Sequence, residues 1–122
     1  MKKFSFSRDE RLKKYNQIKP VFANGRRYRE IFGNLYMRTN DTSRTRLGIV
    51  VRIPKVFKDR AVQRNRIKRL VREFYRLNKH NIVKGIDIVF EVFLSSTSTY
   101  KYNDVEINAF NLCKKARILL SQ

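Results

Sequence analysis

Residues 64–76 read RNRIKRLVREFYR, and this stretch carries the strongest structural signal in the chain. On a helix that turns about 100° per residue, with Arg64 set at zero, its apolar side chains fall within about 220–340°. They are Ile67, Leu70, Val71, Phe74 and, just beyond the stretch, Leu77. The cations and the amide fall within about 0–140°, and they are Arg64, Asn65, Lys68, Arg69, Arg72 and Arg76. The stretch therefore predicts an amphipathic helix with one face on a core and the other displaying cations.

The cationic face has a spacing that suits nucleic acid. Successive turns place Arg64, Lys68, Arg72 and Arg76 about 6 Å apart, similar to the separation of phosphates along a strand. The planar guanidinium binds phosphate bidentately and stacks on bases. Like charges at i, i+4 destabilise an isolated helix, and Glu73 is the only acid in the stretch that offsets them. The alternatives are a merely solvated face and a basic helix on anionic lipid, but the apolar face is needed for the core.

The charge of the whole chain supports the same interpretation. Among its 122 residues, 29 Lys and Arg oppose 10 Asp and Glu, so the net charge is +19. Solubility alone needs a net charge of only about 2–8 in a small domain, so we expect an acidic partner, nucleic acid first and anionic membrane second. The length fits a single RNA-binding domain, residues 1–122, in which residues 1–10 are expected to be flexible.

The rest of the chain predicts a sheet around this helix. Asp59 is a candidate N-cap for a helix over residues 60–79. Residues 31–38 and 47–53 are typical of strands that a polar loop joins. Residues 86–94 are apolar almost throughout, which indicates a central strand.

Two more helices are expected near the ends. The first runs from about residue 16 or 17 to 24, with Gly25 after it, and Pro20 requires either a late start or a kink. The last spans about residues 103–120, where Asn103 and Glu106 resemble a capping box. The order α, β, β, α, β, α predicts an α+β fold, a sheet backed by helices.

The chain contains no recognisable catalytic constellation. His80, the only histidine, lies in a basic segment, and Cys113, the only cysteine, falls on the apolar stripe of the last helix. There is no zinc-type Cys/His cluster, no phosphate-binding glycine loop and no Ser/His/Asp set. No run approaches the roughly 18 apolar residues of a membrane span, the charged N-terminus has no apolar signal run, and one cysteine suits a reducing compartment. We therefore expect a cytoplasmic protein without a metal site, catalytic side chain or membrane association.

The sequence RNRIKRL of residues 64–70, with Arg72, Glu73 and Arg76, resembles the RNR helix of the bacterial ribonuclease P protein subunit. The similarity extends from about residue 11 to residue 120. It includes the RLKK sequence of residues 11–14, Val21-Phe22 and Gly25 in the first helix, Leu35-Tyr36 in the first strand, and Leu47-Gly48-Ile49 in the second.

The resemblance implies a fold like domain 2 of ribosomal protein S5, an α/β sandwich with a left-handed βαβ crossover, whereas the general rule alone predicts a right-handed one. It implies a protein subunit that binds the catalytic RNA of ribonuclease P and the 5′ leader of precursor tRNA, and so supports endonucleolytic 5′ maturation of tRNA. Hydrolysis would be carried out by the RNA with its own Mg²⁺. The protein would need no bound cofactor and no obligate protein partner.

The resemblance also implies roles for individual residues. The RNR helix would face the catalytic RNA through Arg64, Asn65, Arg66, Lys68, Arg69, Arg72 and Arg76. Phe22 and Tyr36 would line a leader cleft between the first helix and the sheet, with Ile18 at a position where the family often has an aromatic; for Phe22 the alternative is core packing. Further basic contacts would come from Arg11, Lys13, Lys14, Lys55 and Lys58. The stretch of residues 52–58 departs from the family pattern, so its geometry is not carried over.

A structural RNA-binding protein of the ribosomal type is the main alternative, because it would share the charge and the fold. Only a ribonuclease P subunit is expected to rescue cleavage of precursor tRNA by the catalytic RNA at low Mg²⁺. A membrane-surface protein would instead bind anionic liposomes through its apolar helix face.

Overall fold

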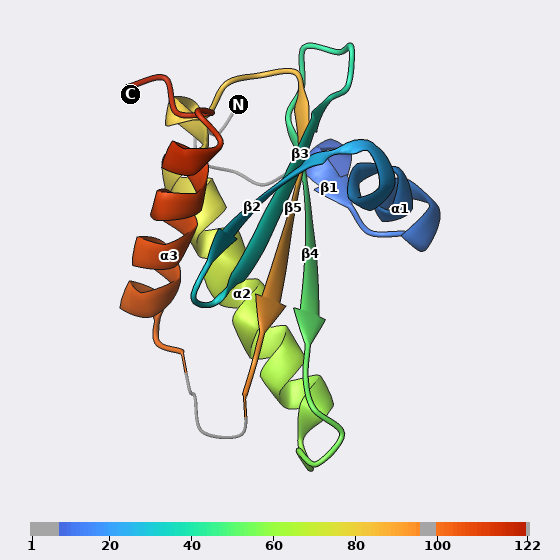
Figure 1. Cartoon of the computed structure of the whole chain (residues 1–122), viewed down its shortest axis with the longest axis vertical. Coiled ribbons are helices and arrows are strands. Elements are labelled where there is room, and N and C mark those ends of the chain that lie inside the picture. The colour runs from blue at the N-terminus through green and yellow to red at the C-terminus, as the bar shows by residue number, and fades with distance from the viewer. Residues whose placement is uncertain (1–7, 96–99, 122) are drawn as a thin grey trace.

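A five-stranded mixed sheet with helices on both faces organises the part of the chain that the structure describes (Figure 1). This computed structural model describes residues 8–95 and 100–121, so residues 1–7 of the segment expected to be flexible lie outside the described residues. The strand order is β1-β4-β5-β3-β2. Strands β1, β4 and β5 are parallel, and β3 and β2 complete the sheet antiparallel. The strands are β1 (Arg11–Leu12), β2 (Arg26–Glu30), β3 (Gly33–Thr39), β4 (Arg46–Arg52) and β5 (Ile86–Phe93).

The helices divide between the two faces of the sheet. Helices α2 (Arg60–Asn78) and α3 (Tyr102–Lys115) cover one face, and α1 (Tyr15–Asn24) covers part of the other. Short 3₁₀ helices, η1 (Arg8–Glu10) and η2 (Lys79–Asn81), precede β1 and follow α2. In Figure 1, β4 and β5 point downward with β4 on the right, and α2 lies behind them. This β4–α2–β5 crossover is left-handed, against the general rule and as the family resemblance implied.

The main core lies between the sheet and the two helices α2 and α3. Phe74 of α2 and Phe90 of β5 are fully buried, and their rings meet edge to face with centroids 6.4 Å apart. Leu112 of α3 packs into the same cluster. Each such side chain contributes about 1.5–3 kcal/mol of stability through burial, so the apolar face of α2 holds this helix on the sheet.

The predicted faces of α2 need two corrections. Ile67, Val71 and Phe74 are buried as expected, but Leu77 is 39% exposed. Tyr75, which is not among the residues of the predicted apolar face, is only 2% exposed. The reason is tertiary: the Tyr75 hydroxyl donates to Glu10 Oε2 at 3.3 Å, because η1 folds back over this end of α2.

The sheet is wider than the sequence predicted. Strand β2 was missed because four of its five residues are charged, which is typical of an exposed edge strand. The predicted strand at residues 31–38 begins later, at Gly33, and Ile31 is 94% exposed in the turn before it. Gly33 has φ +154°, and a Cβ there would stand 1.9 Å from the carbonyl oxygen of Glu91, so only glycine allows β3 to approach β5 at this point.

Several helix ends also differ from expectation. Lys101, not Asn103, is the N-cap of α3, and Asp104 Oδ2 accepts the hydrogen bond of the Lys101 amide at 2.9 Å. Helix α3 ends at Lys115, not near residue 120, and Leu119 instead forms a β-bridge with Ile82. The end of a helix is therefore decided here by a tertiary contact that apolar periodicity does not reveal.

The two other predicted helix starts are closer to the structure. Asp59 precedes α2 as expected, but its side chain makes no capping hydrogen bond. Helix α1 starts at Tyr15, so Pro20 lies inside the helix rather than in its first turn. Since proline lacks an amide hydrogen, the Asn16 carbonyl has no helical partner at this position. None of the helices among the described residues has the length and apolar character of a membrane span.

Candidate nucleic-acid interface

Three cations form a ridge along the exposed side of α2. The pKa of Lys68 is lowered by partial burial and by the neighbouring charges of Arg72 and Arg64. The pKa of Arg72 is lowered by partial burial and by the charge of Arg11, which reaches the ridge from β1. A nearby positive charge disfavours protonation, so Lys68 is repelled by Arg64 and Arg72, and Arg72 is repelled by Arg11. We call Arg64, Lys68, Arg72 and Arg11 the α2 ridge.

The α2 ridge borders a hollow between the helix and the first strand. Lys13 joins Arg11, Lys68 and Arg72 around this hollow. The hollow is also lined by the apolar residues Leu12, Leu47 and Ile49. Cations beside apolar side chains are suited to an anionic group that also presents a flat apolar surface, as a nucleotide does.

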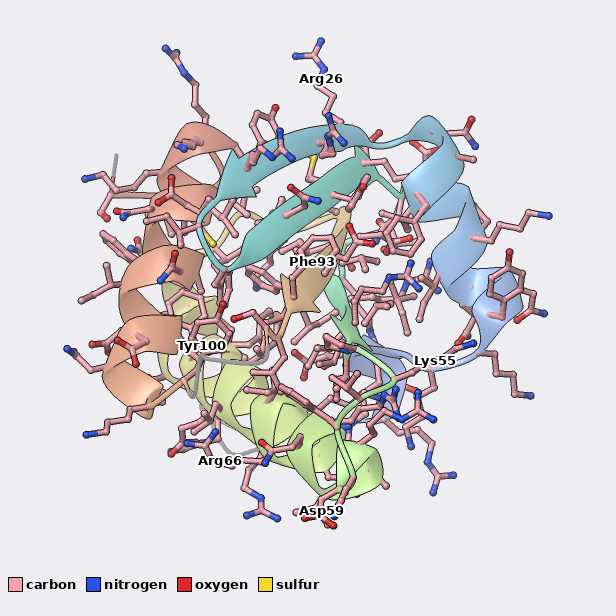
Figure 2. The ribbon with its side chains drawn as sticks, turned by 60° about the horizontal axis from the view of Figure 1, so that its bottom comes forward. Arg26, Lys55, Asp59, Arg66, Phe93 and Tyr100 are labelled. Atoms are coloured by element: carbon pink, nitrogen blue, oxygen red, sulfur yellow. The ribbon has the colours of Figure 1, made fainter. Side chains whose placement is uncertain are left out.

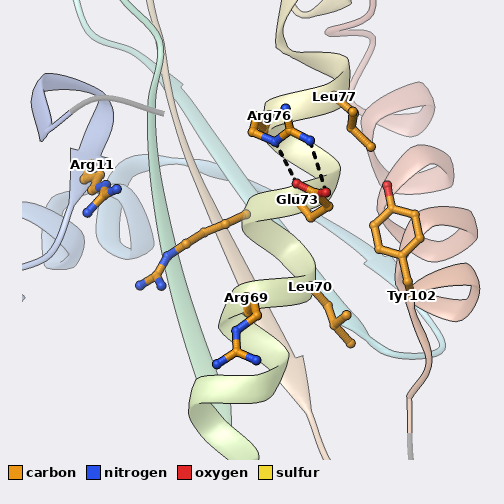
Figure 3. A pocket seen from close by; sticks show the side chains of 8 residues that line it. Arg11, Arg69, Leu70, Glu73, Arg76, Leu77 and Tyr102 are labelled. Carbon is orange, nitrogen blue, oxygen red and sulfur yellow. Dashed lines mark hydrogen bonds and ion pairs between the residues drawn. The ribbon is translucent and has the colours of Figure 1, made fainter. Parts of the chain in front are cut away.

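A second, more open hollow runs along α2 (Figure 3). Figure 3 shows Arg69 and Arg11 on one side of the helix and Leu70, Leu77 and Tyr102 on the other. The exposed Leu77 therefore lines a shared groove with α3.

Arg76 lies in this second hollow but differs from the α2 ridge, because it is paired. Its Nε donates to Glu73 Oε1 at 2.7 Å and its Nη2 to Glu73 Oε2 at 3.1 Å. These hydrogen bonds lower the pKa of Glu73. Arg76 must therefore share its guanidinium between Glu73 and any phosphate.

Arg66, which the resemblance placed among the RNA contacts, is turned toward α3. Its Nη2 donates to the carbonyl oxygen of Tyr100, in the segment that leads into α3 (Figure 2). Arg66 is half-buried, whereas Asn65 and Arg69 beside it are exposed. The geometry gives Arg66 a role in joining α2 to the α3 segment.

The remaining predicted cations lie outside the α2 ridge. Lys14 is exposed at the N-cap of α1, next to Lys13. Lys55 and Lys58 are exposed in the loop between β4 and α2, where Figure 2 labels Lys55. The structure thus brings Arg11 and Lys13 to the α2 ridge and leaves Lys55 and Lys58 on a separate loop.

A second candidate surface lies on the other face of the sheet, beside α1. Phe22 of α1 and Tyr36 of β3 meet edge to face, with ring centroids 4.6 Å apart and an interplanar angle of 73°. Both are half-buried, so each ring packs on the cluster beneath it and still reaches the surface. Ile18 is buried in that cluster with Val21, so it supports the aromatic pair and does not present a stacking surface.

Three polar residues beside this aromatic pair were missed by the sequence analysis. Glu91 of β5 accepts hydrogen bonds from Asn34 Nδ2 at 3.0 Å, Tyr36 Oη at 3.3 Å and Arg52 Nε at 3.0 Å. The Arg52 guanidinium carbon lies 6.0 Å from the centroid of the Phe22 ring. A single acid inside the otherwise apolar residues 88–93 is a signal in the sequence that could have pointed to this group. We call Phe22, Tyr36, Asn34, Arg52 and Glu91 the α1 cleft, after the leader cleft that the family resemblance implies.

The described residues contain no group of three or more His, Cys, Asp or Glu side chains placed to hold a metal ion. His80 is exposed in η2. Cys113 is buried, and burial raises the pKa of its thiol to about 12. Since the thiolate is the reactive form, Cys113 is an inert core residue.

Comparison with known proteins gives the family. The family model for ribonuclease P matches residues 6–117. The ribonuclease P protein component of Syntrophus aciditrophicus is 35% identical over 122 residues, which are 100% of this chain and 93% of that protein. The component from Clostridium botulinum strain Langeland is 38% identical over 112 residues, 91% of this chain and 97% of that protein.

The solved structures agree with this assignment. The ribonuclease P protein of Thermotoga maritima superposes with a TM-score of 0.71 at 32% identity, covering 87% of this chain and 96% of that one. Sequence and fold therefore match the same proteins over nearly their full length. The chain belongs to the ribonuclease P protein family, the protein components of the ribonucleoprotein that matures the 5′ ends of tRNA.

Proposed function

We propose that this chain, as one RNA-binding domain, uses the α2 ridge to bind the catalytic RNA of ribonuclease P and the α1 cleft to bind the 5′ leader of precursor tRNA. The observation that carries the proposal is the α2 ridge. No carboxylate among the described residues forms an ion pair with Arg64, Lys68 or Arg72. Binding of a polyanion relieves the repulsion between these three cations. Each phosphate that they neutralise also releases counterions, which favours binding further.

The contribution of this protein is electrostatic and geometric. No group of three or more His, Cys, Asp or Glu side chains in residues 8–95 and 100–121 is placed to hold a metal ion. We assign the hydrolysis to the RNA subunit and place the Mg²⁺ on the RNA, since Mg²⁺ is bound through oxygen ligands such as phosphates. The protein screens phosphate repulsion, so that precursor tRNA and catalytic RNA can approach at lower Mg²⁺.

The α1 cleft combines aromatic surface with a cation, the two features that bind single-stranded nucleic acid. Phe22 and Tyr36 are half-buried and offer aromatic surface, and Arg52 adds a cation beside them. Stacking of a base on such a ring is worth about 1–3 kcal/mol. Because the bases of a single-stranded leader are not held in a stacked duplex, their faces are free to stack in this cleft. Precursor tRNA is made in the cytoplasm, and we place the assembly there.

Reconstitution tests the proposal. The full chain is added to the ribonuclease P RNA of the same organism, and cleavage of a precursor tRNA is measured as Mg²⁺ is lowered. We expect the protein to maintain cleavage at Mg²⁺ concentrations at which the RNA alone is inactive. The chain in which Arg64, Lys68 and Arg72 are all replaced by Ala should fail to do so while keeping its fold. Equal cleavage with and without the wild-type chain would overturn the proposal.

A further inference from the structure

Glu91 is an unexpected residue on a surface that faces a polyanion. Its side chain is only 10% exposed and points to the α1 side of the sheet, between β4 and β3. A carboxylate at this place repels phosphate. It is nevertheless held by three donors from the two neighbouring strands: Asn34, Tyr36 and Arg52. Because three side chains donate to one acid, Glu91 fixes their positions relative to one another, an effect that net charge does not explain.

The first consequence concerns Tyr36. Its hydroxyl donates to Glu91 Oε1, and this hydrogen bond restrains the rotation of the ring. The ring is thereby kept in its edge-to-face contact with Phe22. With its proton directed at Glu91, the hydroxyl presents oxygen lone pairs, not a donor, to any molecule in the cleft.

The second consequence concerns Arg52, the last residue of β4. Its side chain is 54% exposed, and only the Nε edge of the guanidinium is engaged by Glu91. No acceptor among residues 8–95 and 100–121 is bonded to its two Nη groups. The Arg52 guanidinium can therefore bind one anion through its two Nη groups, while the Glu91 carboxylate fixes the orientation of the guanidinium plane.

We propose that Glu91 is a positioning residue that assembles a nucleotide subsite in the α1 cleft. In this subsite a base packs against the Phe22–Tyr36 pair, and the Nη groups of Arg52 bind the adjacent phosphate. The inference rests on the proposed binding of a single-stranded leader and deepens it, because it names the phosphate-binding residue and the group that orients it. Arg52 lies 6.0 Å from the Phe22 centroid, beside the aromatic pair and outside the stacking position.

The proposed role of Glu91 and simple electrostatics predict opposite changes in RNA affinity when Glu91 is replaced. Removing an acid from an RNA-binding surface should strengthen binding, since one repulsive charge is removed. If Glu91 positions Tyr36 and Arg52, Glu91→Ala should instead weaken binding of precursor tRNA by roughly tenfold. The weakening should appear in KM with kcat unchanged, and only for substrates that carry the 5′ leader. Glu91→Gln, which keeps one acceptor oxygen, should retain part of the affinity.

The experiment uses the full chain assembled with the ribonuclease P RNA and a precursor tRNA with or without its leader. Asp41→Asn is the matched control, because it removes the same charge from an exposed turn between β3 and β4. Asp41 has φ 58°, a conformation that asparagine adopts readily. Arg52→Ala and the Glu91→Ala/Arg52→Ala double variant complete a cycle, in which the double variant should bind little worse than Arg52→Ala alone.

The possible results distinguish a failure of the inferred role of Glu91 from a failure of the proposed leader binding. Affinity for the catalytic RNA alone should be unchanged in every Glu91 variant, and a decrease there would indicate a merely structural role and overturn the inference. Glu91→Gln gives the same test if Glu91→Ala does not fold. If Glu91→Ala binds the leader-carrying substrate as tightly as Asp41→Asn or more tightly, the inference about Glu91 is overturned. The proposed function would then still stand. If the wild-type chain shows no preference for a substrate with a leader, the proposed function of the cleft fails first.

Discussion

The two surfaces that we propose bind RNA differ in how their cations are paired. On α2, Arg64, Lys68 and Arg72 have no acidic partner among the described residues and repel one another. On the α1 side of the sheet, two cations are paired with acids: Arg46 with Asp87 and Arg52 with Glu91. Unpaired charge acts through long-range attraction and is weakened by salt, whereas paired charge gives a fixed geometry. Under the proposed function, α2 would therefore supply affinity for RNA and the sheet face would supply position.

The largest effect is expected where the acid of a charge pair is fully buried. Asp87 is fully buried and accepts hydrogen bonds from Arg46 Nε at 2.9 Å, Arg46 Nη2 at 2.8 Å and Asn40 Nδ2 at 2.8 Å. Asp87→Ala leaves these donors without their acceptor, and it should lower the free energy of unfolding by about 3–5 kcal/mol. Urea unfolding followed by circular dichroism measures the decrease.

The control for this prediction is the exposed pair between Asp9 and Arg44. Exposed ion pairs contribute about 0–1 kcal/mol, so Arg44→Ala should change the free energy of unfolding very little. If Asp87→Ala unfolds at the same urea concentration as Arg44→Ala, paired charges on the sheet face are not structural.

The next largest effect concerns the α2 ridge. Replacement of Arg64, Lys68 and Arg72 together by Ala should weaken binding to the catalytic RNA by about 3 kcal/mol, roughly a hundredfold. The slope of log affinity against log salt should shrink by roughly one for each phosphate that the variant no longer neutralises. Filter binding over a range of KCl concentrations measures both quantities.

A charge-matched control tests whether position matters on α2. Arg26, Lys84 and Lys114 are exposed and lie on β2, in the loop before β5 and on α3. Replacing these three by Ala removes the same net charge, and the salt slope should change less than in the ridge variant. An equal change would mean that net charge alone, and not the ridge, determines RNA binding.

A smaller effect is expected from the aromatic pair. Phe22→Ala removes a stacking surface, so affinity for precursor tRNA should fall by about 1–3 kcal/mol. Affinity for a tRNA without the leader should stay at the wild-type value, because Phe22 lies on the opposite face of the sheet from α2. Competition binding with the two substrates distinguishes these effects, and an equal decrease for both would count against a leader cleft.

The smallest effect should come from Tyr36→Phe, which keeps the ring and removes the hydrogen bond to Glu91. A hydrogen bond of this kind contributes about 1 kcal/mol, so leader-dependent affinity should fall by about fivefold. Ile18→Val, in the cluster below, is a suitable control because Ile18 is buried and offers no surface to RNA. A Tyr36→Phe chain that binds as tightly as the Ile18→Val chain would show that ring orientation is unimportant.

Most of α2 could be predicted from local sequence. The 3.6-residue period of Ile67, Val71 and Phe74 is a property of neighbouring residues, so the sequence predicted the helix, its core face and its ridge of cations. Strand β5 was predictable for the same reason, since it is apolar almost throughout. Strand β2 could not be predicted from local sequence, because its residues are mostly charged and its extended conformation depends on pairing with β3.

The sequence by itself determined the net charge, the amphipathic character of α2 and the family resemblance, because each of these depends on residues close together in the chain or on composition. Tertiary structure alone decided the burial of Tyr75 under η1, the diversion of Arg66 to Tyr100 and the meeting of Asn34, Arg52 and Glu91. Those contacts join residues 34 to 65 positions apart. Their pairing depends on strand register and on the left-handed path of the chain around α2, which no local pattern encodes.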